Sequence, residues 1–238
     1  MKDTNLGNRL LMAASFVKNG DTVCDVGCDH GKLGLYLIQT GRAKKIIATD
    51  INIKPLDKAV KLFEENGLSD KRDFRLTDGL QGVENSDKKI THVVIAGMGG
   101  ITMTKVFEGA DFVKDESINY VLLPAQRGFD IRKYLYENGY DITTEKTVRE
   151  NGKFYTCMLV KYTGVVKQAD IFDIYIGKSY ENTDYSAKGY FELVLTRLKN
   201  KQAGFVAAFG AADEGFAAFC LCLYYNICVY IIIYDIIC

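Results

Sequence analysis

The strongest constraint on the fold is an alternation of short apolar runs with stretches of helical periodicity. The apolar runs predict strands at residues 22–26, 45–49, 73–77, 91–96 and 120–123. Apolar residues at helical spacing predict helices at residues 6–17, 35–40, 54–66, 101–108 and 130–137. Strands that alternate with helices form βαβ units, in which neighbouring strands are parallel and helices cover both faces of the sheet. The alternation therefore predicts an α/β fold with a parallel sheet.

The last two predicted strands differ from the others because only a tight turn separates them. Residues 140–148 and 153–162 alternate between apolar and polar side chains, and Asn151 and Gly152 lie between them. Asn-Gly is favoured in two-residue hairpin turns, and strands joined in this way are antiparallel. A parallel sheet that ends in an antiparallel hairpin suits a Rossmann-like class I methyltransferase sheet better than a plain dinucleotide-binding domain.

Composition divides the chain into three segments. Of the 238 residues, 48% are hydrophobic and 25% are charged, which is enough apolar material for a buried core and excludes global disorder. We assign residues 1–162 to the sheet domain and residues 163–204 to a small helical region. Residues 205–238 form an apolar, cysteine-rich tail without Lys or Arg. This tail has three interpretations: an aberrant end of the coding sequence, a buried helix or a membrane segment. We expect no membrane attachment, because no basic flank follows the tail.

The cysteines and the N-terminus indicate a reducing compartment. Outside the tail, Cys24, Cys28 and Cys157 are too scattered for a disulfide framework. The apolar run at residues 10–14 is too short for a signal peptide, and Lys18 soon follows it. We therefore expect a cytoplasmic protein.

The loop after the first predicted strand carries the clearest signal for a ligand. Gly27 and Gly31 would let the backbone approach a ligand closely, and the helix that follows would present its positive end. The dinucleotide fingerprint requires a glycine at position 29, where this chain has an aspartate. Because a carboxylate repels a pyrophosphate, Asp29 favours a cationic ligand such as S-adenosylmethionine.

Acids and glycines also follow the next predicted strands. Asp50 ends the second strand, where an acid usually accepts hydrogen bonds from ribose hydroxyls, although it could instead cap the next helix. Asp78 and Gly79 follow the third strand and could contact an adenine amino group or form an ordinary turn. Residues 96–100 hold three glycines and would leave backbone groups uncovered for a flat ligand.

Cys24, Cys28 and His30 together suggest a metal site, but we expect none. No fourth ligand stands near them, and His92 is the only other histidine. For His30, a buried structural role and a role in the site are both open.

Five short segments, taken in this order, resemble the bacterial tRNA (adenine-22-N1)-methyltransferases. They are residues 25–30 (DVGCDH), 78–80 (DGL), 95–100 (IAGMGG), 132–135 (RKYL) and 150–155 (ENGKFY). The similarity covers residues 5–162, and the first and third segments are the most specific. The chain departs from the family at residues 31–34 and 123–126, and the tail does not resemble it.

The resemblance implies methyl transfer from S-adenosylmethionine, the cofactor, to N1 of an adenine in the D-loop of tRNA. It also implies that the helical region at residues 163–204 helps to hold the tRNA, and it gives no indication of a protein partner. The implied catalytic residues are Asp29 and His30. The implied cofactor-binding residues are Asp25, Gly27, Cys28, Asp29, Gly31, Asp50, Ile51, Asp78, Gly79, Ala96, Gly97, Met98 and Gly99.

A separate set of residues is expected to contact the tRNA. They are Gln126, Arg127, Arg132 and Lys133. The three cations among them would form a basic face with Arg149 and Lys153, which Arg197, Lys199 and Lys201 could join. An ordinary solvated surface is the alternative for that face. A methyltransferase with another substrate, and a non-catalytic RNA-binding module, are the alternatives for the function.

Overall fold

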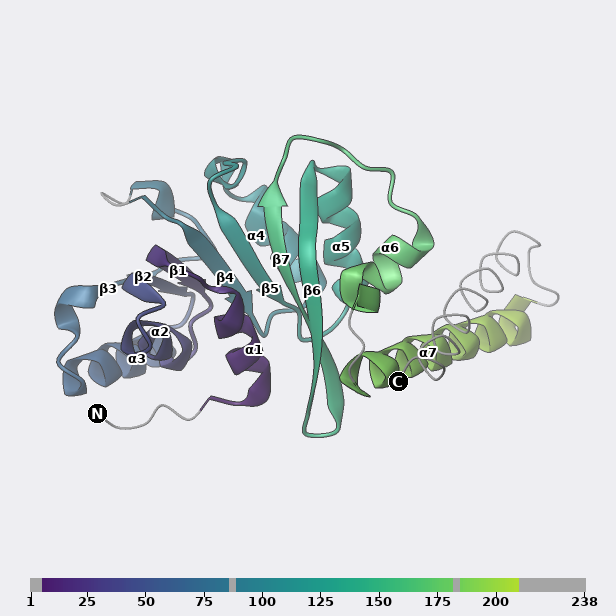
Figure 1. Ribbon diagram of the computed structural model, residues 1–238, viewed down its shortest axis with the longest axis horizontal. Helices are drawn as coiled ribbons and strands as arrows, with labels where there is room; N and C mark the ends of the chain where they lie inside the picture. Colours follow the sequence, from purple (N-terminus) through teal and green to yellow (C-terminus); the bar gives the residue numbers. More distant parts are fainter. Residues whose placement is uncertain (1–5, 86–88, 182–184, 210–238) are drawn as a thin grey trace.

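The computed structural model describes residues 6–85, 89–181 and 185–209, with side chains up to residue 200. A single seven-stranded sheet in the order β3-β2-β1-β4-β5-β7-β6 forms its centre (Figure 1). The strands are β1 (Gly20–Val26), β2 (Ala43–Asp50), β3 (Arg72–Leu76), β4 (His92–Ala96), β5 (Asn119–Leu123), β6 (Tyr140–Glu150) and β7 (Lys153–Tyr162). Strands β1 to β5 pair in parallel, and β7 pairs antiparallel with both β5 and β6. The predicted α/β fold with a closing hairpin is confirmed.

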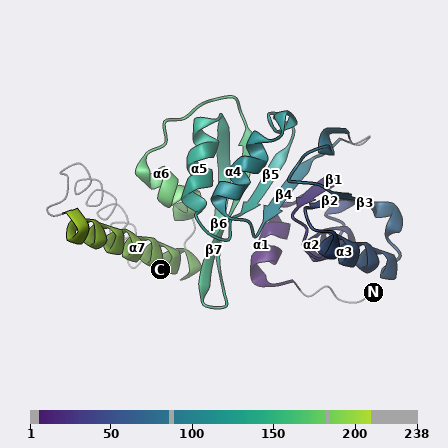
Figure 2. The ribbon, with the colours of Figure 1, turned by 180° about the vertical axis from the view of Figure 1, so that it is seen from behind.

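Helices cover both faces of the sheet (Figure 2). One face carries α1 (Asn8–Phe16), α2 (Lys32–Gln39) and α3 (Ile53–Glu65), and the other carries α4 (Gly100–Glu108) and α5 (Gly128–Glu137). Consecutive residues of a strand point to opposite faces, so a strand between two helical layers must be apolar throughout. Val23 and Cys24 of β1 illustrate this, since both are fully buried but belong to different core clusters. This double burial explains the continuous apolar runs in the sequence.

The β6–β7 hairpin is longer than the parallel strands and projects beyond them (Figure 1). Its turn residues, Asn151 and Gly152, have φ values of +49° and +75°. A two-residue turn with both central residues in the left-handed region suits the twist of an antiparallel pair, and Asn and Gly adopt that region at little cost. The predicted hairpin turn is confirmed.

Helices follow the sheet after β7. They comprise α6 (Ile171–Tyr175), the 3₁₀ segment η4 (Gly177–Glu181) and α7 (Tyr185–Phe209), and shorter 3₁₀ turns lie within the sheet domain at η1 (Ser69–Lys71), η2 (Val83–Asn85) and η3 (Asp111–Val113). Asp170 caps α6 by accepting a 2.7 Å hydrogen bond from the Asp173 N–H. Residues 210–238 of the predicted apolar tail lie outside the described residues. None of the helices in the described part of the chain is long and apolar enough to span a membrane.

A buried ion pair joins this helical region to the sheet. Arg132 of α5 and Glu145 of β6 form the pair, and their side chains are at most 1% exposed. The Arg132 guanidinium also donates to the backbone carbonyls of Ile174 and Tyr175, at 3.2 and 3.3 Å. The expectation that Arg132 belongs to an exposed basic face is therefore wrong, because Glu145 and the end of α6 enclose the guanidinium.

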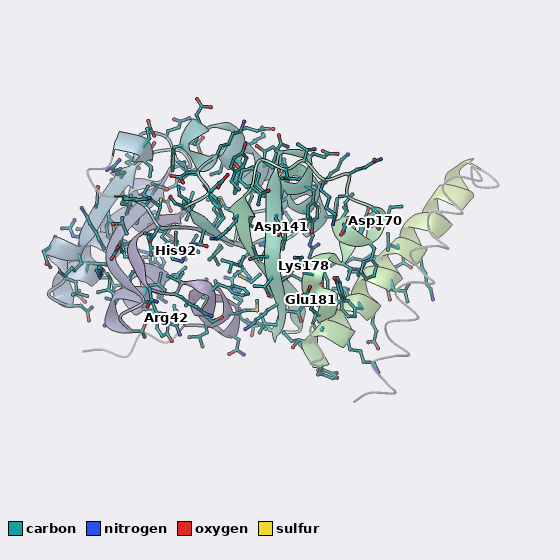
Figure 3. The ribbon with its side chains drawn as sticks, turned by 45° about the horizontal axis from the view of Figure 1, so that its top comes forward. Arg42, His92, Asp141, Asp170, Lys178 and Glu181 are labelled. Atoms are coloured by element: carbon teal, nitrogen blue, oxygen red, sulfur yellow. The ribbon has the colours of Figure 1, made fainter. Side chains whose placement is uncertain are left out.

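A second, exposed contact joins the same parts of the molecule. Lys178 of η4 lies 4.0 Å from the Asp141 carboxylate of β6, and both are labelled in Figure 3. Ion pairs that are accessible to solvent contribute little to stability, so we expect this partly exposed contact to add little to the junction.

Candidate functional site

The glycine-rich and acidic loops lie together at the carboxyl ends of the parallel strands. β1 ends at Val26, β2 at Asp50, β4 at Ala96 and β5 at Leu123. Parallel strands place these ends at one edge of the sheet, where open α/β folds bind their ligands. The structure therefore brings the predicted loops to one edge, in the order that the strand pairing dictates.

The loop after β1 needs glycine at two positions. Gly27 and Gly31 have φ values of +69° and +70°, in the left-handed region. A Cβ on Gly27 would lie 2.3 Å from Cε of Met98, and a Cβ on Gly31 would lie 2.7 Å from Cβ of Ala59. The loop is anchored by two hydrogen bonds from the Gly27 and Cys28 N–H groups to the Thr49 carbonyl, at 2.8 and 3.0 Å. It thus follows the end of β2 closely, and at Gly27 and Gly31 its backbone is not covered by a side chain of its own.

Asp25 is the most unusual charged group of the site. Its side chain is only 3% exposed, and within the described part of the chain its Oδ2 has no hydrogen-bond partner. Burial, together with the nearby carboxylates of Asp29 and Asp50, raises the pKa of Asp25 from 3.8 to about 7. A buried carboxylate without a partner favours either a proton or a cationic ligand. The charge at this edge therefore selects for a cation.

Asp29 and His30 stand at the opening of the same loop. Asp29 adopts a φ of +50°, which few non-glycine residues do, and its side chain is 81% exposed. His30 Nε2 lies 3.2 Å from Lys58 Nζ and 3.6 Å from Asp29 Oδ1. Because an ammonium group can only donate, Nε2 accepts from Lys58 and cannot also donate to Asp29. In this geometry the Asp29 carboxylate is free to face a ligand, and His30 is half-buried beside it.

The end of β2 and the loop after β3 form the next part of the site. Asp50 Oδ1 accepts a 2.8 Å hydrogen bond from the Asn52 N–H, so part of this carboxylate organises the start of α3. The neighbouring Ile51 is 67% exposed, an apolar surface that a flat ring could cover. The Thr49 hydroxyl donates to the Gly79 carbonyl at 2.8 Å and ties the Asp78–Gly79 turn to β2. The N-cap of α3 is Asn52 rather than Asp50, so of the two roles open for Asp50 the helix cap is not observed.

The loops after β4 and β5 are joined by backbone hydrogen bonds. Gly97 N–H donates to the Leu123 carbonyl at 2.9 Å, and Ala125 N–H donates to the Met98 carbonyl at 2.8 Å. Gly100 N–H donates to the Gln126 carbonyl at 3.0 Å. Residues 96–99, predicted to face the cofactor, are thus held beside Gln126, predicted to face the substrate.

The structure also brings Arg9 of α1 to this edge, which the sequence did not predict. The position of a Cβ on Gly97 would be 3.9 Å from Arg9 Nη1. Arg9 Nε pairs with Glu150 Oε2 at 3.1 Å, and its guanidinium lies 5.5 Å from the ring centroid of Tyr155. The sequence pointed to Arg9 only indirectly, because its partners Glu150 and Tyr155 belong to the family-like segment at residues 150–155. Arg9 itself lies 141 residues before Glu150, so no local pattern connects them.

The other predicted cations have different surroundings. Arg127 is half-exposed next to Gln126 and pairs with Asp130, at 2.6 Å between Nε and Oδ2. Lys133 is exposed on α5 and lies 3.8 Å from Glu137 of the next helical turn. Arg127 therefore adjoins the site, whereas Lys133 belongs to the solvent face of α5.

The thiols of Cys24 in β1 and Cys28 in the loop are poorly suited to metal binding or nucleophilic chemistry. Cys24 and Cys28 are buried, and burial raises the pKa of both thiols well above their usual range. Within residues 6–85, 89–181 and 185–209, no three His, Cys, Asp or Glu side chains cluster in a way that could hold a metal ion.

These residues fit S-adenosylmethionine. The unpartnered, buried Asp25 and the exposed Asp29 match its positive charges, and the Gly27 and Gly31 positions provide a cradle that a Cβ would fill. Asp50 and Ile51 would hold its ribose and adenine, and Asp78 would lie next to the adenine. The helix α2 begins at this loop without a side-chain cap, which leaves room for a carboxylate.

Comparisons with known proteins agree with this fit. A protein family described as "Methyltransferase domain" matches residues 6–158 of the chain. The tRNA (adenine(22)-N(1))-methyltransferase of Bacillus subtilis (strain 168) is 28% identical over 161 residues, which cover 68% of this chain and 67% of that protein.

Two solved structures resemble the whole described fold. The B. subtilis M1A22 tRNA methyltransferase TrmK has a TM-score of 0.80 at 21% identity and covers 96% of this chain and 100% of its own, which shows the fold. A Streptococcus pneumoniae protein in complex with S-adenosyl-L-methionine has a TM-score of 0.78 at 26% identity, covering 95% of this chain and 100% of its own. These matches extend over the helices after β7 as well as the sheet.

Proposed function

The chain belongs to the methyltransferase-domain family, and we propose that it transfers a methyl group from S-adenosylmethionine to N1 of adenine 22 in tRNA. The B. subtilis relative named above carries this activity in its name. The observation that carries the proposal is the buried, unpartnered Asp25 at an edge of the sheet that also holds the two joined loops of Gly97–Gly99 and Gln126. This arrangement combines a site for a cationic cofactor with an adjacent surface for a base.

The reaction needs orientation more than proton transfer. At neutral pH the N1 lone pair of adenine is free, so no general base has to remove a proton before the attack. When bound, S-adenosylmethionine supplies a methyl group attached to a positively charged sulfur. The protein must hold the base so that N1 faces that methyl group, which is catalysis by proximity and orientation. An N1 that is paired in a helix is inaccessible, so the target base has to be splayed out.

The chain offers several groups for this task. The exposed carboxylate of Asp29 stabilises the positive charge that develops on the methylated base, because an oriented anion in the site lowers the energy of a cationic product. The carbonyl and amide groups of the Gly97–Gly99 loop and the side chain of Gln126 orient the base. Arg9, whose charge Glu150 neutralises, adds guanidinium N–H groups that are held in place and can donate to the same nucleotide.

The partner and the location follow from the substrate. A tRNA-modifying enzyme acts where tRNA is present, which supports the cytoplasm as its compartment. The cations next to Gln126, with Arg127 first among them, support contacts with the tRNA backbone.

The experiment that tests the proposal is a methyl-transfer assay with mapping of the product. The full chain is incubated with labelled S-adenosylmethionine and unmodified tRNA that carries adenine 22, and the modified nucleoside is identified by mass spectrometry. We expect 1-methyladenosine at that position and none in a tRNA with guanine there. Methylation at another position or atom would contradict the assigned substrate while leaving the family membership intact.

The role of Asp29 is tested separately. Asp29→Ala should lower kcat by about 10²- to 10³-fold, the range observed when one oriented charge-stabilising group is removed. Asp21→Ala is the matched control, because Asp21 is an exposed acid at the opposite end of β1, where it pairs with Lys44. Equal activity of the two variants would remove Asp29 from the mechanism.

A further inference from the structure

The described residues contain a cavity that borders the proposed methyl-transfer site. It has a volume of about 420 Å³ and lies between the loop after β5, the β6–β7 hairpin and α7. The hairpin turn and the start of α7 lie side by side in both ribbon views (Figures 1 and 2). Building on the proposed function, we propose that this cavity binds a second, unpaired nucleotide of the tRNA, next to the target adenine.

The charge of the cavity favours a phosphate. Its charged lining residues are all cations: Arg127 from the β5–α5 loop, Lys153 from the hairpin, Arg197 from α7, and Arg132. Glu145 already neutralises Arg132, but within the described part of the chain neither Lys153 nor Arg197 forms an ion pair. Asp130 neutralises Arg127 as well, so among the described residues the cavity keeps two cations without an ion pair, Lys153 from the hairpin and Arg197 from α7, and no carboxylate lines it. Two cations from separate elements are complementary to an anionic backbone.

The walls of the cavity favour a base. Aromatic rings line it, and nucleic-acid bases stack on such rings without sequence preference. Phe129 stacks against Tyr175 with ring centroids 5.3 Å apart and an interplanar angle of 21°. Leu193 and Val194 of α7 complete an apolar wall. A nucleotide combines a flat apolar ring with a negative phosphate, and the cavity presents the matching surfaces together.

The cavity is preformed by tight packing of α7 on the hairpin. A Cβ on Gly189 of α7 would lie 2.3 Å from Cζ of Phe154, so this helix contacts the ring without an intervening side chain. The Tyr190 hydroxyl donates to the Tyr175 carbonyl at 3.1 Å and links α7 to α6. Little ordering is then needed when a ligand binds, which favours affinity.

Continuity with the methyl-transfer site identifies which nucleotide fits. Gln126 lines the cavity and also forms a parallel bridge with Gly99 of the cofactor-facing loop. The two sites therefore share one wall, so a strand whose target base reaches Gly99 would place a flanking nucleotide in the cavity.

The first arm of the test uses variants of the full chain that either reduce the volume of the cavity or remove its positive charges. Leu193→Trp adds bulk from α7, and Lys153→Ala with Arg197→Ala removes two cations. Lys61→Ala, an exposed cation on α3, is the matched control. Circular dichroism and the Kd for S-adenosylmethionine establish that each variant is folded.

The expected results differ between the variants. Leu193→Trp should weaken tRNA binding by about tenfold, in line with the loss of one stacked base. The double cation variant should lower the slope of log K against log salt by about one for each phosphate that it no longer neutralises, whereas Lys61→Ala should leave the slope unchanged. An equal decrease of the slope in Lys61→Ala would show that the cations act only through overall charge and would overturn the proposal.

The decisive arm uses tRNA with an abasic site immediately 5′ or 3′ of the target adenine. Each lesion is compared in the wild type and in Leu193→Trp, so that a double-mutant cycle isolates the interaction between the base and the cavity. We expect one lesion to weaken binding to the wild type by about tenfold but to have little further effect on Leu193→Trp. Equal effects on both proteins would overturn the cavity assignment.

Binding and methylation are measured on the same samples, which separates the two proposals. A missing 1-methyladenosine together with the expected cycle would contradict the proposed reaction and support the nucleotide cavity. Normal methylation, together with additive effects of the abasic lesion and Leu193→Trp on binding, would support the proposed reaction and contradict the nucleotide cavity.

Discussion

Replacing Asp25 with Asn should stabilise the free protein at neutral and alkaline pH. Burial, with Asp29 and Asp50 nearby, raises the pKa of Asp25 from 3.8 to about 7, so the folded state holds a proton that the unfolded chain releases. The contribution of this carboxyl to stability is therefore fully present below pH 3.8 and is lost as the pH rises through 7. Asparagine keeps the shape of the protonated acid but does not ionise.

The magnitude follows from the two pKa values. One pKa unit corresponds to about 1.4 kcal/mol, so the change from 3.8 to about 7 corresponds to about 4 kcal/mol. Asp25 is 3% exposed, so solvent does not screen this contribution appreciably. The free energy of unfolding of Asp25→Asn minus that of the wild type should rise by about 1.4 kcal/mol per pH unit between about pH 4 and pH 7 and then level off.

Urea denaturation of both proteins across this pH range measures the difference directly. Asp73→Asn is the opposite control, because a hydrogen bond from Arg75 lowers the pKa of Asp73 and its ionised form stabilises the fold. For that variant the difference should fall as the pH rises toward 3.8, the pKa in the unfolded chain, and should stay flat between about pH 4 and pH 7. Asp25→Asn should also weaken binding of S-adenosylmethionine although it stabilises the protein. A difference for Asp25→Asn that is flat or falls with pH would refute the inference that Asp25 is a buried acid without a partner.

Two further predictions concern the packing around the site. Arg132→Met should lower the free energy of unfolding by about 3–5 kcal/mol because it removes the guanidinium from the buried carboxylate of Glu145. The double variant with Glu145→Leu should recover part of this loss. Denaturation of the single and double variants checks this prediction, and additive losses would contradict it. Gly100→Ala should cost about 1–3 kcal/mol and reduce methyl transfer more than cofactor binding, since its Cβ would lie 2.1 Å from the Arg127 carbonyl oxygen. Gly109→Ala at the end of the same helix, where the nearest atom is 3.3 Å away, is the control, and equal activity losses would argue against it.

Much of the fold was predictable because its signals are local. Each predicted strand has a counterpart in the sheet, and the Asn151–Gly152 turn lies where the dipeptide indicated. The loops also came together as expected, because parallel strands end at one edge whichever strands are neighbours. The positions of Asp29, Asp50 and Gly97 at that edge required no knowledge of packing.

Other features depended on residues that are distant in the sequence. Arginine is usually found at the surface of a protein. Arg132 is nevertheless buried, because its guanidinium contacts Glu145 and two carbonyl groups of the α6 region. Arg9 reaches Gly97 only because α1 packs against the β6–β7 hairpin, where Glu150 holds it.

The sequence by itself determined the kind of sheet, the loops at its carboxyl edge and the preference of that edge for a cation. Spacing and residue type carry this information, since they decide which backbone conformations and charges each segment can adopt. Only the tertiary structure decided that Asp25 is buried without a hydrogen-bond partner for Oδ2 and that Arg132 is buried in an ion pair. It also decided that α7 lines a cavity beside Gln126. Burial and convergence depend on which distant segments pack together, and no local pattern in the chain encodes that.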